Sequence, residues 1–178
     1  MQIEDGQGNG YRVGVNSSNR LKVNASVVSI VEQINEEDGR VWAAPLVAIA
    51  PSGATYFFLF QNKGQRVLAV QKIILASTVA GVFLIRKISG TAANGTDLVP
   101  TNMNLAATGQ PDTSVIQTGT SITGLTEEGI LFPIYLAANV PFTSEIGPKI
   151  YVPPGTGIAI KAPGAATVNG WVEFYEES

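Results

Sequence analysis

Apolar and polar residues alternate along much of the chain, in short runs separated by turn-forming residues. The runs YRVGV (11–15) and RLKVNASVV (20–28) alternate with a period of two, which is typical of strands with one buried face. NSSN (16–19) lies between them and is typical of a turn. The pattern therefore predicts an N-terminal β-hairpin. Its apolar positions are Tyr11, Val13 and Val15 on the first strand and Leu21 and Val23 on the second.

From residue 40 onward the chain contains longer apolar runs. Their β-branched and aromatic content, with turn signals at about every ten residues, favours strands over buried helices. Several runs, notably TYFFLF (55–60) and KIILA (72–76), are apolar at consecutive positions. This predicts strands buried on both faces, as in a sandwich whose outer face meets another subunit. The runs are VWAAPLVAIAP (41–51), ATYFFLFQN (54–62), RVLAVQKIILAS (66–77), GVFLIRKIS (81–89), GILFPIYLA (129–137), EIGPKIYV (145–152), TGIAIKA (156–162) and NGWVEFYEE (169–177).

One segment before these runs allows a helix. IVEQINEED (30–38) has an apolar pair at positions i and i+4, Ile30 and Ile34, and is followed by Gly39. A single short helix and an extended linker are both compatible with this pattern.

Residues 88–126 differ in composition from the rest of the chain. They carry two charges, Asp97 and Asp112, and are rich in Thr, Asn, Ala and Gly. We expect long connections here, with short strands at LVPTNM (98–103) and SVIQTGT (114–120). A loop-rich segment of this length is usually functional or forms an interface.

The order of these elements predicts the fold class. Strands at regular spacing without crossover helices indicate an antiparallel sheet, so the chain is expected to be an all-β sandwich. About eight strands with long connections favour a two-sheet jelly roll over an up-and-down barrel, whose links would be short. We expect two parts: a glycine-rich arm, hairpin and linker over 1–39, and a jelly-roll domain over 40–178.

Charge narrows the range of partners. The net charge is −3 and the eleven basic residues are scattered, which argues against nucleic acid as a partner. Charged residues make up 14% of the chain, against about a quarter in an ordinary soluble domain. Such a chain is expected to cover part of its surface with copies of itself or with a partner.

There is no apolar run long enough for a membrane span, no secretory signal and no cysteine, which fits synthesis in a reducing cytoplasm.

The residue types needed for most catalysis are missing. The chain has no histidine and no cysteine, which removes the usual acid–base residue and the usual zinc ligands. Neither a phosphate-binding loop pattern nor a G-x-S-x-G nucleophile pattern occurs. Adjacent acidic residues in turn-rich or terminal segments are more often solvated than catalytic. These groups are Glu36-Glu37-Asp38, Glu127-Glu128 and Glu176-Glu177.

The N-terminal EDGQGNG (4–10) is a candidate calcium loop. Starting from Asp5, the third position is Gln7 and the twelfth is Asn16 in place of the usual glutamate, and flanking helices are not expected. A phosphate cradle is excluded because no strand precedes the segment and no helix follows it. We therefore expect no metal, no cofactor and no enzymatic activity. The glycines instead allow this segment to lie flat against another protein.

Both ends of the chain resemble known virion proteins. IEDGQGNGYRVGVNSSNRLKVNA (3–25) resembles a pattern at the N-termini of tailed-bacteriophage virion proteins: an acidic-glycine stretch, a G-Y-x-x-x-V strand and an N-R-L-x-V strand. IYVPPGTGIAIKA (150–162), followed by NGWVEFYEE (169–177), resembles the closing strands of phage jelly-roll proteins that sit on capsids.

This resemblance implies a capsid decoration protein, also called a cement or auxiliary head protein. Such a protein is typically a homotrimer that binds the outer surface of the shell and bridges subunits of the major capsid protein. The chain would then be made in the host cytoplasm and reside on the capsid surface of the virion. A phage tail or fibre protein, or a receptor- or carbohydrate-binding module, is the alternative. Exposed aromatic residues on loops would mark a binding module. Most of the Phe and Tyr residues lie inside strand runs instead, whereas Tyr56, Tyr135 and Tyr151 are open to an outward orientation.

The N-terminal hairpin is the expected contact with the capsid or with neighbouring subunits. A hairpin of this size is too small to be stable alone, and it contains the aromatic and arginine residues that are enriched at interfaces. The candidate interface residues are Tyr11, Arg12, Val13, Val15, Arg20, Leu21 and Val23.

Overall fold

A computed structural model describes residues 35, 39–107, 109, 111 and 114–177, with the backbone alone for 144–148. The expected hairpin at 11–28 lies outside these residues, as does nearly all of the expected helix or linker at 30–38. The described residues form strands and contain no α-helix, so the expected all-β class is confirmed for this part of the chain.

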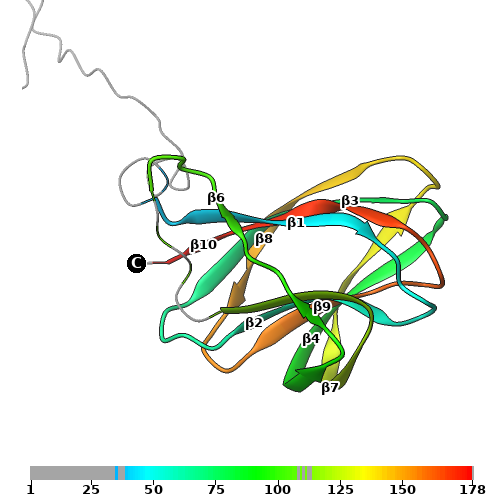
Figure 1. The fold of residues 1–178 in the computed structure, drawn as a ribbon, viewed down its shortest axis with the longest axis horizontal. Coiled ribbons are helices and arrows are strands. Elements are labelled where there is room, and N and C mark those ends of the chain that lie inside the picture. The colour runs from blue at the N-terminus through cyan, green and yellow to red at the C-terminus, as the bar shows by residue number, and fades with distance from the viewer. Residues whose placement is uncertain (1–34, 36–38, 108, 110, 112–113, 178) are drawn as a thin grey trace, which may run out of the picture. The chain divides into compact units, whose positions relative to one another are not determined.

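Ten strands make up the described part of the chain (Figure 1). Each long apolar run identified in the sequence falls on a strand. The strands are β1 (Val41–Ile49), β2 (Tyr56–Asn62), β3 (Leu68–Ser77), β4 (Gly81–Ala93), β5 (Thr96–Asp97), β6 (Thr101–Asn102), β7 (Ser114–Leu136), β8 (Phe142–Val152), β9 (Gly157–Lys161) and β10 (Val168–Glu176).

The strands form two antiparallel sheets that face each other (Figure 1). The first sheet has the order β6-β1-β10-β3-β8, and the second has the order β2-β9-β4-β7-β5. Strand β10 lies between β1 and β3, so the last strand of the chain occupies the centre of the first sheet. The expected antiparallel sandwich is therefore confirmed.

The main core lies between the two sheets. In β10, Val172 and Phe174 are fully buried, whereas Trp171 and Glu173 lie on the outer face, as the alternation in the sequence predicts. Phe174 stacks on Trp42 with ring centroids 5.8 Å apart, so the first and last strands share one aromatic contact. Burial of these apolar side chains, at about 25 cal/mol per Å², is the main force that holds the sheets together.

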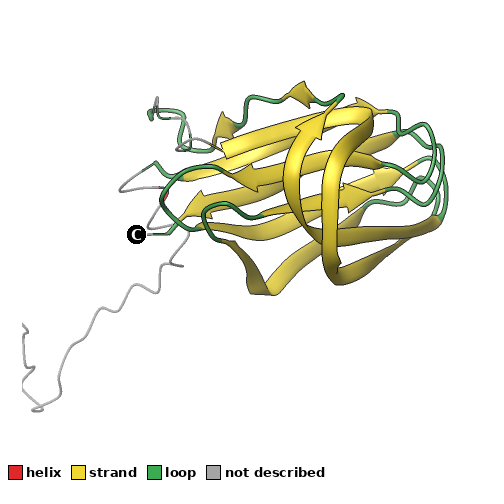
Figure 2. Cartoon of the chain, turned by 90° about the horizontal axis from the view of Figure 1, so that it is seen from below, coloured by secondary structure: helices red, strands yellow, loops and turns green. Residues whose placement is uncertain are grey.

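Residues 114–136 form one continuous strand, although the sequence predicted two strands and a loop-rich segment there. The first part of β7 pairs with β2, and the second part pairs with β4. Between these parts β7 bends, and β4 bends with it, so that the two strands curl over one side of the sandwich (Figure 2). Gly90 and Gly124 have positive φ at the bend, and a Cβ on Gly124 would lie 2.3 Å from the carbonyl oxygen of Thr91. The glycines that suggested loops thus lie where these long strands bend and allow the close approach of their backbones.

This bend covers a second core on the outer face of β2 and β9. Leu59 of β2, fully buried, packs there with Ile122 of β7 and Ile88 of β4. The consecutive apolar residues of β2 are therefore buried on both faces, as predicted, but by the same chain and not by another subunit. Tyr56, which the sequence left open as an outward-facing aromatic residue, is 8% exposed and belongs to this second core.

Candidate interaction surfaces

The expected interface residues in the N-terminal hairpin lie outside the described residues. They are Tyr11, Arg12, Val13, Val15, Arg20, Leu21 and Val23. Their role as an interface stays a prediction.

Glu127 is at the centre of a charged cluster where β7 passes over β4 and β9. Its carboxylate accepts hydrogen bonds from the Arg86 guanidinium and, at 3.1 Å, from the Lys161 ammonium. The neighbouring Glu128 pairs with Lys87 at 2.7 Å. Both acidic residues of this pair are therefore bound to cations, and the cluster fastens the bent part of β7 to β4 and β9.

Tyr56 lies next to this cluster. Burial, and then the nearby Glu127 carboxylate, raise the pKa of the Tyr56 hydroxyl above its ordinary range. The hydroxyl and then Lys161 lower the pKa of the Glu127 carboxyl. The buried Tyr56 hydroxyl has no hydrogen-bond partner within bonding distance. It therefore acts on the Glu127 carboxylate as an electrostatic neighbour and not through a standard hydrogen bond. The Glu127 carboxylate is thus held ionised between cations.

No other arrangement suited to chemistry is found in the described part of the chain. Glu176 is buried and accepts a hydrogen bond from Arg66 at 3.2 Å. Within the described ranges, acidic side chains do not gather in groups of three or more that would hold a metal ion. Those ranges also lack a helix long and apolar enough to cross a membrane.

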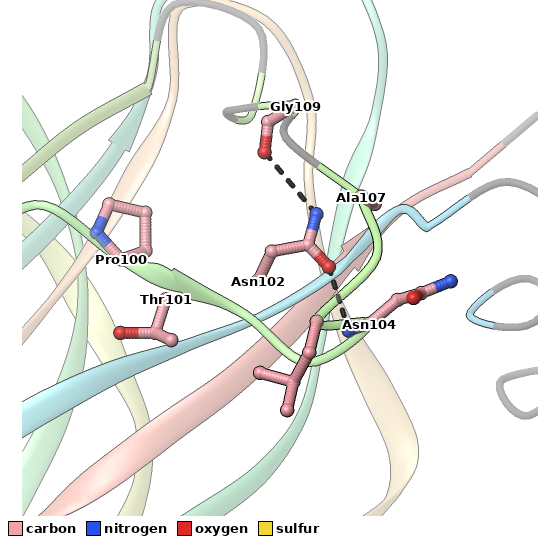
Figure 3. Close-up of a pocket in the computed structure, with 7 residues that line it drawn as sticks. Pro100, Thr101, Asn102, Asn104, Ala107 and Gly109 are labelled. Atoms are coloured by element: carbon pink, nitrogen blue, oxygen red, sulfur yellow. Dashed lines mark hydrogen bonds between the residues drawn. The ribbon is translucent and has the colours of Figure 1, made fainter.

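The loop after β6 presents apolar side chains to solvent. Leu105 is 94% exposed and Met103 is 45% exposed. Successive asparagines hold the loop in shape. The side-chain oxygen of Asn102 accepts from the backbone N–H of Asn104 (Figure 3). The side-chain oxygen of Asn104 accepts from the N–H of Ala106. We call residues 102–107 the Leu105 loop.

The Leu105 loop borders a shallow pocket and is tied to the start of the sandwich. The pocket has a volume of about 330 Å³ and is lined by residues between Pro100 and Gly109 (Figure 3). Asn102 donates to the carbonyl oxygens of Gly39 at 2.7 Å and Gly109 at 3.2 Å. Asn104 donates to the carbonyl oxygen of Asn35 at 2.8 Å. No charged residue occurs from 98 to 111, so the loop offers an uncharged surface with a fixed shape.

A second uncharged surface lies on β4, β7 and the loops next to them. Neither 77–85 nor 129–143 contains a charged residue, and we call these residues the uncharged corner. Val82 of β4 pairs across the strands with Tyr135 of β7. The two loops are joined by a bridge between Ser77 and Ala138. Six of the twelve exposed large apolar residues of the described chain lie here: Val79, Val82, Ile130, Leu131, Tyr135 and Val140.

The two surfaces lie at opposite ends of the sandwich. The Leu105 loop is next to the first residues of β1, because the N–H of Met103 donates to the carbonyl oxygen of Val41. The uncharged corner is next to the last residue of β1, because Ile49 pairs with Val168 and Val168 pairs with Ser77. A strand of this length spans about 25 to 30 Å. The two surfaces are therefore separated by about the length of one strand.

In the described part of the chain, the exposed aromatic residues are on strands and not on loops. Tyr135 is 72% exposed on β7, Tyr151 is 50% exposed on β8, and Trp171 is 39% exposed on β10. Tyr135 and Tyr151, for which the sequence left an outward orientation open, thus both face outward.

No protein-family model matches the chain, and no curated protein or solved structure matches it either.

Sequence reasoning missed both surfaces, although part of the signal was present. The absence of charge over 129–143 and over 98–111 can be counted directly. The strand pairing that brings 77–85 next to 129–143 could not be predicted from the sequence. The same holds for the hydrogen bonds that shape the Leu105 loop.

Proposed function

We propose that the chain is a non-enzymatic structural virion protein that binds the outer surface of a phage capsid and bridges its subunits. The observation that carries this proposal is the pair of uncharged, apolar surfaces at opposite ends of a sandwich whose own cores are closed. A bridging protein needs two separate contact areas, and exposed apolar patches mark such areas. The resemblance of both ends of the sequence to phage virion proteins supports the same assignment, with a homotrimer and the major capsid protein as the expected partners.

We further propose that the sandwich is a jelly roll. The order β1-β10-β3-β8 in one sheet and β2-β9-β4-β7 in the other supports this topology, with β5 and β6 as short additions. In a jelly roll, eight strands form two such sheets through Greek-key connections.

The test uses capsids assembled from the genome that encodes the chain, with this one gene deleted. Purified chain is added, the capsids are sedimented, and bound chain is quantified. We expect saturable binding and a higher temperature of capsid disruption. Leu105→Lys should weaken binding because it places a charge on a fully exposed apolar contact, whereas Val47→Lys, on a residue that is 73% exposed, is the matched control. Absence of binding by the unaltered chain contradicts the proposal.

A carbohydrate- or receptor-binding module of a phage tail or fibre is the second candidate. Three exposed aromatic residues, Tyr135, Tyr151 and Trp171, favour it, because aromatic faces offer large rigid contact areas. A glycan-binding screen tests this candidate: saturable binding that is lost in Trp171→Ala supports it, and no binding contradicts it.

A further inference from the structure

We propose that a second copy of the chain docks on the uncharged corner, through antiparallel pairing of the free edges of two β7 strands. The contact would follow a two-fold axis, so that the same residues of each copy meet. It needs no capsid. A corner occupied by a second copy is not free for the capsid, so in such a pair the two capsid contacts of the proposed function would be the two Leu105 loops, one from each copy.

The first support is the free edge of β7. From Leu125 to Leu136 this strand pairs with β4 on one side, and no strand of the described chain pairs with its other side. An unpaired edge presents a row of N–H and C=O groups that can bind another strand, and proteins usually block such edges with charged residues, bulges or a covering element. Residues 129–136 contain no charge. Pro133 removes one N–H group, and the pairing with β4 shifts register between Ile130 and Phe132, so the edge offers its remaining groups on either side of these positions.

The second support is the set of side chains that flank this edge. Leu131 is 43% exposed, Ile130 is 55% exposed and Tyr135 is 72% exposed. Pairing two β7 edges would extend each sheet into its partner and place these side chains beside their equivalents. Two uncharged surfaces can be buried against each other without removing a charge from water. A second molecule of the same chain carries an identical uncharged surface.

The third support is that the corner is already ordered in one molecule. The N–H of Asn139 donates to the carbonyl oxygen of Ser77 at 2.7 Å, and the N–H of Val79 donates to the Ser77 hydroxyl at 3.2 Å. These bonds fix the loops that carry Val79 and Val140. Little conformational entropy is then lost on docking, which is the usual condition for a strong contact of limited area.

The corner is also bounded by charges that are already paired. Arg86 and Lys87 follow the apolar part of β4, and Glu127 and Glu128 precede the apolar part of β7. They form ion pairs with each other across the two strands. A polar rim around an apolar centre is the usual layout of a protein–protein interface. Because the rim charges are satisfied within one chain, they add no requirement for a charged partner.

The first experiment is sedimentation of the full chain over a range of concentrations. We expect a mass that rises to an even multiple of the starting species. The variant Leu131→Lys with Tyr135→Lys should weaken this association by about tenfold or more, because each of the two copies then brings two positive charges to the contact. Val47→Lys with Tyr151→Lys is the matched control: it also replaces one exposed aliphatic residue and one exposed tyrosine by lysine, but on the first sheet, and it should leave the association unchanged.

Two outcomes overturn the proposal. One is a mass that does not change up to about 1 mM chain, whether it is one chain or three. The other is a corner variant that associates within twofold of the unaltered chain while keeping its thermal melting temperature. A fixed mass of three chains would still agree with the expected homotrimer, so the two proposals fail separately.

The second experiment uses the absence of cysteine in the chain. A single cysteine close to a two-fold axis forms a disulfide with its own copy under mild oxidation, whereas a cysteine at a contact with a foreign protein does not. We expect Leu131→Cys or Tyr135→Cys to yield a covalent dimer and Val47→Cys to yield none. Failure of both corner variants to cross-link above the level of Val47→Cys overturns the two-fold contact.

Discussion

Asn62 joins three parts of the chain through its side chain, and its removal has a cost that the structure allows us to estimate. It is fully buried at the end of β2. Its amide nitrogen donates to the carbonyl oxygens of Arg66 and Val152, each at 2.7 Å, and its oxygen accepts from the N–H of Gly64 at 3.0 Å. Asn62→Ala deletes three hydrogen bonds and leaves three backbone groups without these partners. At about 1 kcal/mol for each bond, the free energy of unfolding should fall by about 3 kcal/mol.

Urea unfolding followed by circular dichroism measures this change. The midpoint should fall while the slope m stays constant, and the melting temperature should drop by about 6 to 12 °C. Ser52→Ala is the control, because it removes an exposed hydroxyl that donates to the Thr120 carbonyl oxygen at 3.3 Å, and it should change stability by less than about 0.5 kcal/mol. A loss of less than about 1 kcal/mol in Asn62→Ala would refute the reasoning.

Three further predictions concern the backbone and the ion pairs. Gly170→Ala should cost more than about 3 kcal/mol, because a Cβ there would lie 1.9 Å from the carbonyl oxygen of Ile74; near-normal stability in urea would contradict this. Ala48→Gly should stabilise by about 0.5 to 1 kcal/mol, since Ala48 has a φ of 50°, and a lower melting temperature would count against it. The pKa of Glu127 is lowered in the folded state, so its contribution to stability is complete above the ordinary value of 4.5 and is lost as the pH falls through the lower folded value. Glu127→Gln should flatten the acid side of the stability–pH curve, and an unchanged curve would show that the ion pair with Lys161 contributes nothing.

The strands of the sandwich could be predicted from the sequence because most of them are dense in apolar, β-branched residues. The burial of β2 on both faces was also predictable from TYFFLF. What covers its outer face was not, because Ile122 and Leu125 lie more than sixty residues further along the chain. Local patterns report that a face is buried, and they do not identify the group that buries it.

Strands lie within 98–103 and over 114–120 as expected, and β7 shows why the rest of its course up to residue 126 was taken for a connection. Threonine, serine and glycine are common in loops, but they are also tolerated in a strand that bends and has one exposed face. Gly119, Gly124 and Gly129 divide the apolar positions of β7 into pieces too short to be recognised as one strand. The candidate surfaces could not be predicted for a related reason: exposure of Tyr135 and burial of Tyr56 depend on which strands cover them.

The central position of β10 in the first sheet has a consequence for how the protein is made. Strands β1 and β3 both pair with β10, so neither can complete its pairing until Val168–Glu176 has left the ribosome. The first sheet therefore cannot form before β10 has been synthesised, and a product that ends before Val168 would lack the strand that joins β1 to β3. A product without β10 would leave the edges of both β1 and β3 unpaired and could not form the first sheet.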